Sequence, residues 1–305
     1  LGDRVTSFAN TRTQLARELE RVGVADVFLH YAGRAFQRFG FPFWMVAALR
    51  EWKRKFPTGR LVVYFHELPG EFPVSSRHHW LSKVSSAVAA RIGGLADVLI
   101  TNSEHHAAKL RALAGRADIH LIPIGATVAV NPSPATSRAR TEFVIFGLPF
   151  GRAQTLALFR EHIRRWISGG GLTALHLVGP PDDTASDHPL HDFENVIIRH
   201  GTLPSDEVAA LLGRVGFALT NATEETWSKS TSFMAAVANR CPVVIAQRRP
   251  EATPFSFAVS ADEVETISEA ELQERTARLA QWYEANADWS VTSRKMAALT
   301  RHDDG

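Results

Sequence analysis

A chain of 305 residues exceeds one small domain, and two domains of about 150 residues each are the natural expectation. Apolar residues make up 45% and charged residues 22%, which excludes wholesale disorder. The formal net charge of +2 argues against a dedicated nucleic-acid-binding protein, which normally carries a concentrated basic face.

The sequence also bears on the compartment. No run approaches the roughly 18 apolar residues of a membrane-spanning helix, and the first residues, LGDRVTSFAN, do not resemble a signal peptide. A single cysteine, Cys241, cannot form an internal disulfide, and its place beside a proline at a strand start favours a buried, inert thiol. We therefore expect a cytoplasmic protein.

Short apolar runs rich in β-branched residues alternate with amphipathic stretches along the chain. The runs are apolar on consecutive residues, which is typical of strands covered on both faces. The predicted strands are 26–31, 60–66, 97–102 and 119–124, followed by 142–147, 172–179, 195–201, 216–221 and 242–246. The predicted helices are 8–22, 41–55, 76–93, 103–114, 152–168, 205–213 and 229–239, with further helices after the last strand.

This alternation implies parallel sheets with right-handed crossovers. The stretch TVAVNPSPATSRAR, residues 127–140, has no periodicity and is interpreted as an interdomain linker. We predict an α/β protein of two doubly wound Rossmann-like domains facing across a cleft, with C-terminal helices. The domains would be 1–127 and 142–305, with the linker at 128–141. Ligands of such sheets bind at the carboxyl ends of the strands.

In the first domain, polar residues stand at two strand ends. His30 and Tyr31 end the first predicted strand, and His66 and Glu67 end the second, ahead of a Pro-Gly turn. A histidine there can hydrogen-bond a substrate hydroxyl. The alternative is a histidine packed at a strand end and satisfied by the backbone.

Two stretches of the first domain combine basic and aromatic residues. They are REWKRKF at 50–56 and SSRHHWLSK at 75–83. Each is interpreted either as a solvated helix face or as a patch for an anionic membrane surface or a lipid-phosphate acceptor.

In the second domain, two helix starts follow strand ends. Gly147 opens a loop that leads to Arg152 in the first turn of a helix. Glycine lets the backbone approach a ligand, a helix N-terminus favours anions, and arginine binds phosphate in a bidentate manner. No Gly-x-Gly-x-x-Gly or P-loop pattern is present. This loop is either a phosphate site or ordinary turn chemistry.

The second helix start is Lys229, followed by Ser230, Thr231 and Ser232. An ammonium, hydroxyls and free amides together make an anion site, although plain N-capping explains part of the pattern. Glu224 and Glu225, just before it, can accept hydrogen bonds from sugar hydroxyls. Two anion sites in one domain suit a diphosphate.

Histidine spacing argues against a metal site. The chain has 13 histidines, yet none falls into a ligand pattern such as His-Glu-x-x-His. His105 and His106 are adjacent on a predicted helix and point to different sides of it.

The layout resembles retaining glycosyltransferases with the GT-B fold, of the family 4 or family 1 kind. The resemblance covers about residues 24–303 and is carried by FHELPGEF, LADVLITNSEHHAAKLRAL, the linker and GTLPSDEVAALLGRVGFALTNATEETWSKSTSFMAAVANRCPVVI. It implies that the second domain binds a nucleotide sugar and that His66 lies near the transferred sugar. It also implies that Arg152 is one of two cations that grip the donor diphosphate, with Lys229 replacing the other, and that neither a metal nor a cofactor is essential.

The chain departs from the family pattern in several places. The second of two family glutamates, which holds the nucleotide ribose, corresponds to Ala235, and the first corresponds to Trp227. Arg240 replaces the glycine before Pro242. The family's glycine-rich loop after its first strand has no match in LGDRVTSFAN, so we expect the first domain to be incomplete at its N-terminus.

The sequence therefore predicts a metal-independent enzyme that moves a hexose from a UDP- or GDP-sugar to an acceptor hydroxyl with retention of configuration. The acceptor would be a glycan, a lipid or a small molecule, with contact to the inner membrane face through 50–56 and 75–83 and with no nucleic-acid partner. The alternative is a catalytically inactive GT-B-like module that binds a nucleotide or a partner. The assigned site residues are His66 and Glu225 for catalysis, His30, Tyr31 and Glu67 on the acceptor side, and Gly147, Arg152, Lys229, Ser230, Thr231 and Glu224 for the donor.

Overall fold

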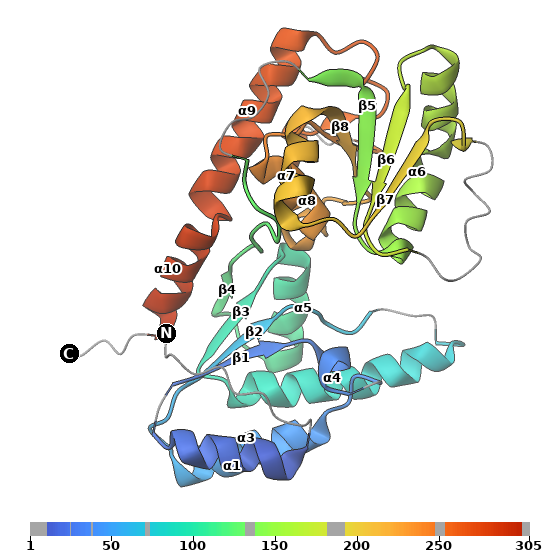
Figure 1. Cartoon of the computed structure of the whole chain (residues 1–305). Coiled ribbons are helices and arrows are strands. Elements are labelled where there is room, and N and C mark those ends of the chain that lie inside the picture. The colour runs from blue at the N-terminus through green and yellow to red at the C-terminus, as the bar shows by residue number, and fades with distance from the viewer. Residues whose placement is uncertain are drawn as a thin grey trace. The chain divides into compact units, whose positions relative to one another are not determined.

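The computed structural model describes residues 11–24, 26–37, 39–70, 74–131, 138–181, 193–247 and 254–300. The chain divides into two compact units (Figure 1), one made of Leu1–Pro123 with Ser293–Gly305 and the other of Ile124–Thr292. The boundary falls shortly before the predicted linker 128–141, of which residues 132–137 lie outside the described ranges.

The first unit contains a parallel sheet of strand order β1-β2-β3-β4. Its strands are β1 (Val27–Tyr31), β2 (Leu61–Phe65), β3 (Val98–Thr101) and β4 (Ile119–Leu121), all at predicted positions. Its helices are α1 (Arg12–Val22), α2 (Gly33–Phe36), α3 (Phe43–Lys55), α4 (Arg77–Leu95) and α5 (Glu104–Ala114).

Both faces of the first sheet are covered, as the continuous apolar strands predict. Successive strand residues face opposite sides, so Leu61, Val63 and Phe65 pack against α1, α3, α4 and α5. Val62 and Tyr64 face the other side, where Met296 and Leu299 of α10 (Trp289–Thr300) pack against them. The last helix therefore completes the core of the unit that begins the chain.

The second unit contains a parallel sheet of order β10-β9-β8-β5-β6-β7. The strand order reverses between β5 and β8, which is the switch point of a doubly wound sheet. The strands are β5 (Ala139–Phe146), β6 (Ala174–Val178), β7 (Ile197–Gly201), β8 (Val215–Leu219), β9 (Val243–Ile245) and β10 (Val259–Ser260). Only β10, of two residues, was not predicted.

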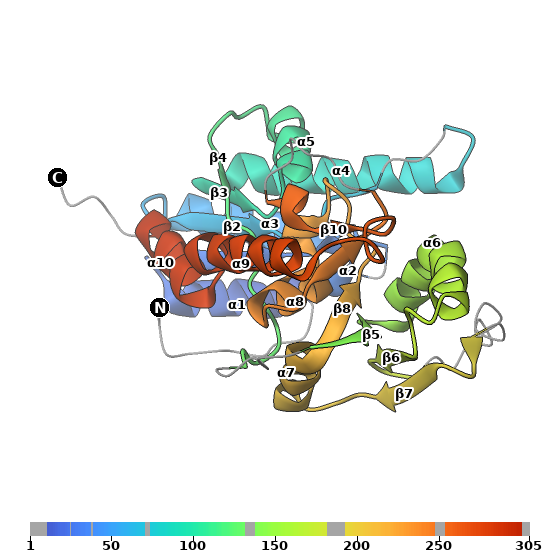
Figure 2. The ribbon, with the colours of Figure 1, turned by 90° about the horizontal axis from the view of Figure 1, so that it is seen from above.

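The helices of this unit lie on opposite faces of its sheet (Figure 2). On one face, Phe159, Ile163 and Trp166 of α6 (Pro149–Ser168) pack against the strands. On the other face lie α7 (Ser205–Arg214), α8 (Thr231–Ala238) and α9 (Glu269–Asn286). These two parallel α/β sheets confirm the predicted fold class.

The helix predicted at 229–239 begins later than expected. A 3-10 turn at Trp227–Lys229 comes first, and α8 begins at Thr231 with Ser230 as its N-cap. The hydroxyl residues from Ser230 onward were predicted to be helical throughout. Ser230 instead has extended backbone, as an N-cap does, and separates the 3-10 turn from α8. The short helix α2 was also not predicted. Cys241 is buried, and this burial raises the pKa of its thiol to about 12, in agreement with the predicted inert role.

Candidate functional site

Two histidines meet at the carboxyl edge of the first sheet. The parallel register pairs Tyr31 with Phe65, so His30 on β1 and His66 directly after β2 come side by side. The backbone amide of His66 donates to the backbone carbonyl of Tyr31 over 3.0 Å. The imidazole atoms His30 Nδ1 and His66 Nε2 are 2.7 Å apart, and the two rings stack with centroids 5.0 Å apart and planes 22° apart.

This histidine pair is neutral near pH 7. Partial burial lowers the pKa of His30 and lowers the pKa of His66 to about 4, with repulsion from His30 as the second cause for His66. One ring must donate its N–H and the other must accept it, so two protonated rings cannot keep the bond. The pair therefore offers neutral hydrogen-bonding groups.

The surroundings of His66 hold it in place. The ring of Tyr64 lies 4.2 Å from the His66 ring, and the Tyr64 hydroxyl is anchored on the carbonyl of Ile122 over 2.7 Å. Asn102, which follows β3, donates from Nδ2 to the His66 carbonyl over 3.1 Å. Asn102 is 3% exposed, and its Oδ1 has no partner within the described ranges. Sequence reasoning missed Asn102, although it follows its strand just as His66 does.

The other two residues predicted at this edge lie differently. Tyr31 points to the opposite face from His30 and is buried against Phe65, with ring centroids 5.1 Å apart. Burial raises the pKa of its hydroxyl to about 12. Glu67 follows His66 in the chain and is exposed. The structure thus brings together His30 and His66, while Tyr31 belongs to the core.

In the second unit, a close backbone approach joins the ends of β5 and β6. Gly147 has φ 149° and Gly179 has φ 135°, both in the region that favours glycine. A Cβ on Gly179 would lie 2.0 Å from the Gly147 carbonyl oxygen and 2.4 Å from Nη1 of Arg152. Arg152 donates to the carbonyl of Gly147 over 2.7 Å and to that of Pro180 over 2.6 Å. Its positive charge is therefore fixed at this strand edge.

The segment from Lys229 to Thr231 forms the start of α8. Lys229 ends the 3-10 turn and is half-buried, while Thr231 is exposed. The Ser230 Oγ accepts a hydrogen bond from the Phe233 amide over 3.3 Å, which is ordinary N-capping. Ser230 is thus already used as a cap.

The loop after β8 carries Glu224 and Glu225, and both are exposed. The loop is closed by a hydrogen bond of 2.9 Å from the Thr223 amide to Oγ1 of Thr226. Asn221, earlier in the loop, donates to Gln154 of α6 over 2.9 Å and links the ends of β5 and β8. These links bring the predicted donor residues of two loops to the same strand edge.

Helix α8 contains no carboxylate, because its sequence is TSFMAAVA. Ala235, at the position of the family's second glutamate, is 0% exposed and belongs to the apolar core beside Met234 and Ala236. An acidic side chain at this position would need a partner for its charge inside that core.

A second histidine pair, missed from the sequence, lies within the second sheet. His176 Nδ1 on β6 is 2.8 Å from His200 Nε2 on β7, and the rings stack at 5.1 Å and 22°. His176 Nε2 lies 3.2 Å from the carboxylate of Glu142, which also accepts from Arg214 over 2.7 Å. Burial lowers the pKa of His176. The sequence signal that could have revealed this pair is one histidine on each of two predicted neighbouring strands.

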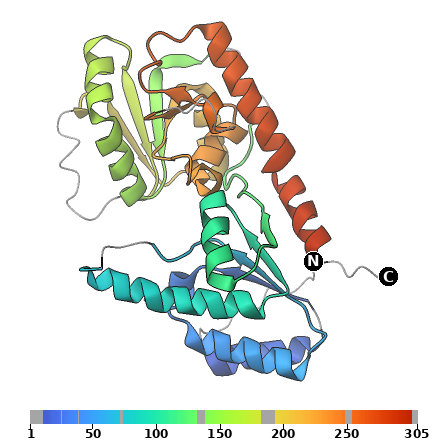
Figure 3. The same ribbon diagram turned by 180° about the vertical axis from the view of Figure 1, so that it is seen from behind.

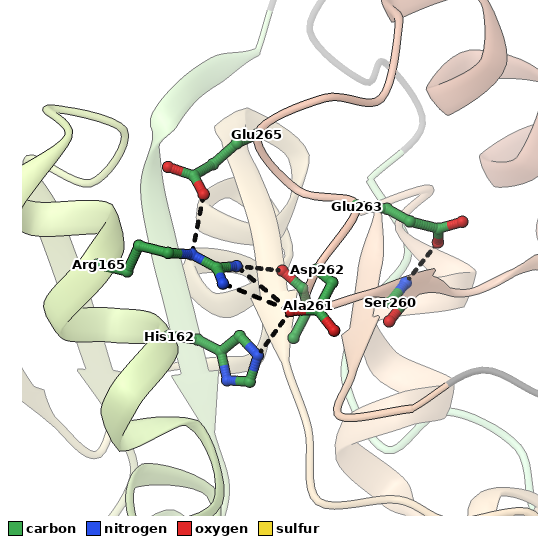
Figure 4. Close-up of polar contacts among 7 residues, drawn as sticks. All are labelled: His162, Arg165, Ser260, Ala261, Asp262, Glu263 and Glu265. Carbon is green, nitrogen blue, oxygen red and sulfur yellow. Dashed lines mark hydrogen bonds and ion pairs between the residues drawn. The ribbon is translucent and has the colours of Figure 1, made fainter.

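A further cluster of charged residues joins α6 to the segment after β10 (Figure 4). His162 Nε2 lies 3.2 Å from the Asp262 carboxylate, and Arg165 lies 3.5 Å from Asp262 and 3.0 Å from Glu265. These side chains pair with one another across two elements, which indicates a structural role.

No group of three or more His, Cys, Asp and Glu side chains within the described ranges is arranged to hold a metal ion. None of the helices in the same ranges combines the length and apolarity needed to cross a membrane.

No protein-family model matches the sequence, and no similar curated protein was found. Solved structures do match. One is α,α-trehalose 6-phosphate synthase from Burkholderia multivorans, with 15% identity over 94% of this chain and 74% of that chain and a TM-score of 0.67.

Two further solved structures match over nearly the whole chain. A variant of S. aureus TarM in complex with fondaparinux, α-GlcNAc-glycerol and UDP shares 12% identity over 95% of this chain and 59% of that chain, with a TM-score of 0.65. WaaG, a glycosyltransferase involved in lipopolysaccharide biosynthesis, shares 11% identity over 96% of this chain and 95% of that chain, with a TM-score of 0.54. The chain therefore has the GT-B fold of glycosyltransferases.

Proposed function

We propose that the protein is a glycosyltransferase that moves a hexose from a nucleotide diphosphate sugar to an acceptor hydroxyl with retention of configuration. The observation that carries the proposal is the neutral His30–His66 pair at the carboxyl edge of the first sheet, in a chain with the GT-B fold. Ligands of parallel α/β sheets bind at this edge.

The second unit would hold the donor. Gly147 and Gly179 bring two strand ends into close approach, and Arg152 keeps a positive charge beside them. Lys229 and Thr231 add an ammonium and a hydroxyl at the start of α8. A diphosphate group suits these cations and the amides of a helix N-terminus.

In the reaction, a bond forms between the acceptor oxygen and the anomeric carbon, the bond from that carbon to the diphosphate oxygen breaks, and the proton of the acceptor hydroxyl passes to the departing diphosphate. Negative charge grows on the departing diphosphate. Arg152 and Lys229 would stabilise that charge as it develops, which is electrostatic catalysis without a metal.

His66 would contact the transferred sugar or the acceptor through the ring nitrogen Nδ1, which faces away from His30 in their hydrogen bond. Because the pair is neutral, this contact is a hydrogen bond to a hydroxyl and not an ion pair with phosphate. Glu225, exposed in the loop after β8, would accept hydrogen bonds from sugar hydroxyls, and Glu224 would assist on the donor side.

A second candidate is a catalytically inactive module that binds a nucleotide or a partner protein. The observation in its favour is α8, which has no carboxylate and carries the buried Ala235 where the family has its ribose-binding glutamate. A shared fold does not by itself imply activity.

Calorimetry and turnover on one protein sample distinguish the two candidates. The enzyme should bind UDP or GDP and release the nucleotide from UDP-glucose or GDP-mannose, and release should slow in a Lys229→Ala variant. Nucleotide binding without release from any sugar donor would support the inactive module. Unchanged release by Lys229→Ala would remove the role given to that lysine.

A further inference from the structure

An exposed apolar surface lies on the first unit, and we name it the α4 surface. It consists of large apolar side chains before α3 and along the N-terminal half of α4: Phe39, Phe43, Val74, Trp80, Leu81 and Val84. Their exposed fractions range from 38% for Leu81 to 70% for Val74. A cluster of exposed aromatic and aliphatic side chains marks an interaction site more often than scattered single residues do.

The parts of the α4 surface lie next to one another. Trp80 and Val84 are one helical turn apart on α4, in a row that Val88 and Ile92 continue; the row is exposed in the N-terminal half of the helix and buried in the C-terminal half. The Arg91 guanidinium, further along α4, lies 6.0 Å from the Phe43 ring. All views show the N-terminal part of α4 extending past α1 and α3 (Figure 3).

The described segments that form this surface carry charge of one sign. Residues 27–37, 39–50 and 74–96 contain no aspartate or glutamate. Their basic residues include Arg34, Arg50, Lys83 and Arg91. Exposed tryptophan and aliphatic side chains beside lysine and arginine are the combination that inserts into, and is attracted by, an anionic lipid headgroup layer.

The other basic stretch of the unit, residues 50–56, differs in its surroundings. Lys53 donates to the Gly59 carbonyl over 2.9 Å and pairs with Asp97, and Lys55 pairs with Glu20 over 2.8 Å. Trp52, directly before Lys53, is buried. Because Lys53 and Lys55 are paired with carboxylates and Trp52 is buried, we interpret this stretch as a solvated helix face.

We propose that the α4 surface docks the protein on an anionic lipid membrane, with Trp80 and Val84 inserted between headgroups and Lys83 and Arg91 against lipid phosphates. The docking is peripheral, because no helix in the described part of the chain can span a bilayer. It concerns only the first unit and does not depend on sugar transfer.

Vesicle flotation of the full chain tests the proposal. We expect the protein to float with vesicles of phosphatidylcholine and phosphatidylglycerol, to stay behind with phosphatidylcholine alone, and to dissociate in high salt. A Trp80→Ser/Val84→Ser double variant should bind the anionic vesicles about tenfold more weakly, because two exposed apolar side chains no longer insert. Lys83→Glu should weaken binding through charge alone.

Two matched control variants make the outcome decisive. Val24→Ser removes an apolar side chain of 65% exposure two residues after α1, and Arg54→Glu reverses a charge in the 50–56 stretch. Both should bind anionic vesicles like the unaltered chain. Failure of the unaltered chain to float, equal binding to neutral vesicles, or equal loss in the controls would each overturn the proposal; the first result would leave a protein partner as the occupant of this surface.

Discussion

The molecule contains two histidine pairs of nearly identical geometry, one at an edge and one inside a sheet. The nitrogens of His30 and His66 are 2.7 Å apart and those of His176 and His200 are 2.8 Å apart, and both pairs of rings stack at 22°. They differ in what lies beyond the pair. In the second pair, His176 contacts the carboxylate of Glu142, which also accepts a hydrogen bond from Arg214. No carboxylate within the described ranges contacts the first pair.

This difference separates a structural pair from the pair that we propose to be functional. In the second pair, Glu142 accepts from His176 Nε2, so His176 Nδ1 must accept the proton of His200, and the tautomers are set from within. In the first pair, we propose that the outer nitrogens, His30 Nε2 and His66 Nδ1, face a ligand. The second unit instead presents glycines and cations at its own strand edge. We therefore propose that the same side-chain contact serves two purposes in this protein, according to the residues beside it.

The strongest test of this separation compares two alanine variants. His66→Ala should lower kcat for sugar transfer by about a hundredfold, because it removes a hydrogen bond to a reacting sugar. His200→Ala should leave kcat within about twofold. It should lower the thermal unfolding temperature, because the buried Nδ1 of His176 loses its hydrogen bond to His200. Equal loss of kcat in both variants would break the comparison.

The next test addresses the strand edge of the second unit. Gly179→Ala should destabilise the protein by about 3 kcal/mol, because its Cβ would overlap the Gly147 carbonyl and Arg152. Gly151→Ala is the matched control; it lies in α6 with nothing within 4 Å of the new methyl group and should be neutral or slightly stabilising. Denaturant unfolding measures both, and a stable Gly179→Ala variant would refute the close approach.

Removal of Lys229 should have a smaller effect on catalysis. Lys229→Ala should lower kcat by about tenfold with a normal fold, because one of two cations near the departing diphosphate is lost. Arg278→Ala serves as control, since Arg278 pairs with Glu274 on α9 over 2.7 Å, away from the strand edge. A loss of equal size in the control would point to a general effect of net charge.

The smallest expected effect concerns pH. The folded-state pKa values of His66, about 4, and of His176 lie below the unfolded value of about 6.5, so the unfolded chain binds protons first as the pH falls. The free energy of unfolding should therefore decrease from about pH 6.5 downward, and His176→Gln should flatten that decrease. Thermal unfolding at several pH values provides the measurement, and an unchanged slope in His176→Gln would contradict it.

The sequence predicted the sheets well because their strands are continuous apolar runs. Every predicted strand from 26–31 to 242–246 exists, and His66 stands at the expected strand end. The short strand β10 and the helix α2 carry too few residues for a periodic signal.

Other features depend on tertiary neighbours. The spatial proximity of His30 and His66 follows from the parallel register, whereas the distinction from His176 and His200 needs the position of Glu142. Likewise, the basic stretches 50–56 and 75–83 have a similar composition in the sequence. The fold distinguishes them, because it places Asp97 beside Lys53 and Glu20 beside Lys55. Sequence composition alone does not supply such partners.

The most direct measurement follows nucleotide release and nucleotide binding in parallel for the unaltered chain and for His66→Ala. The account predicts that the unaltered chain releases UDP or GDP from its sugar donor, and that His66→Ala binds the same nucleotide with unchanged affinity but releases it about a hundredfold more slowly. Equal release by both proteins, or loss of nucleotide binding in His66→Ala, would contradict the role assigned to the first histidine pair.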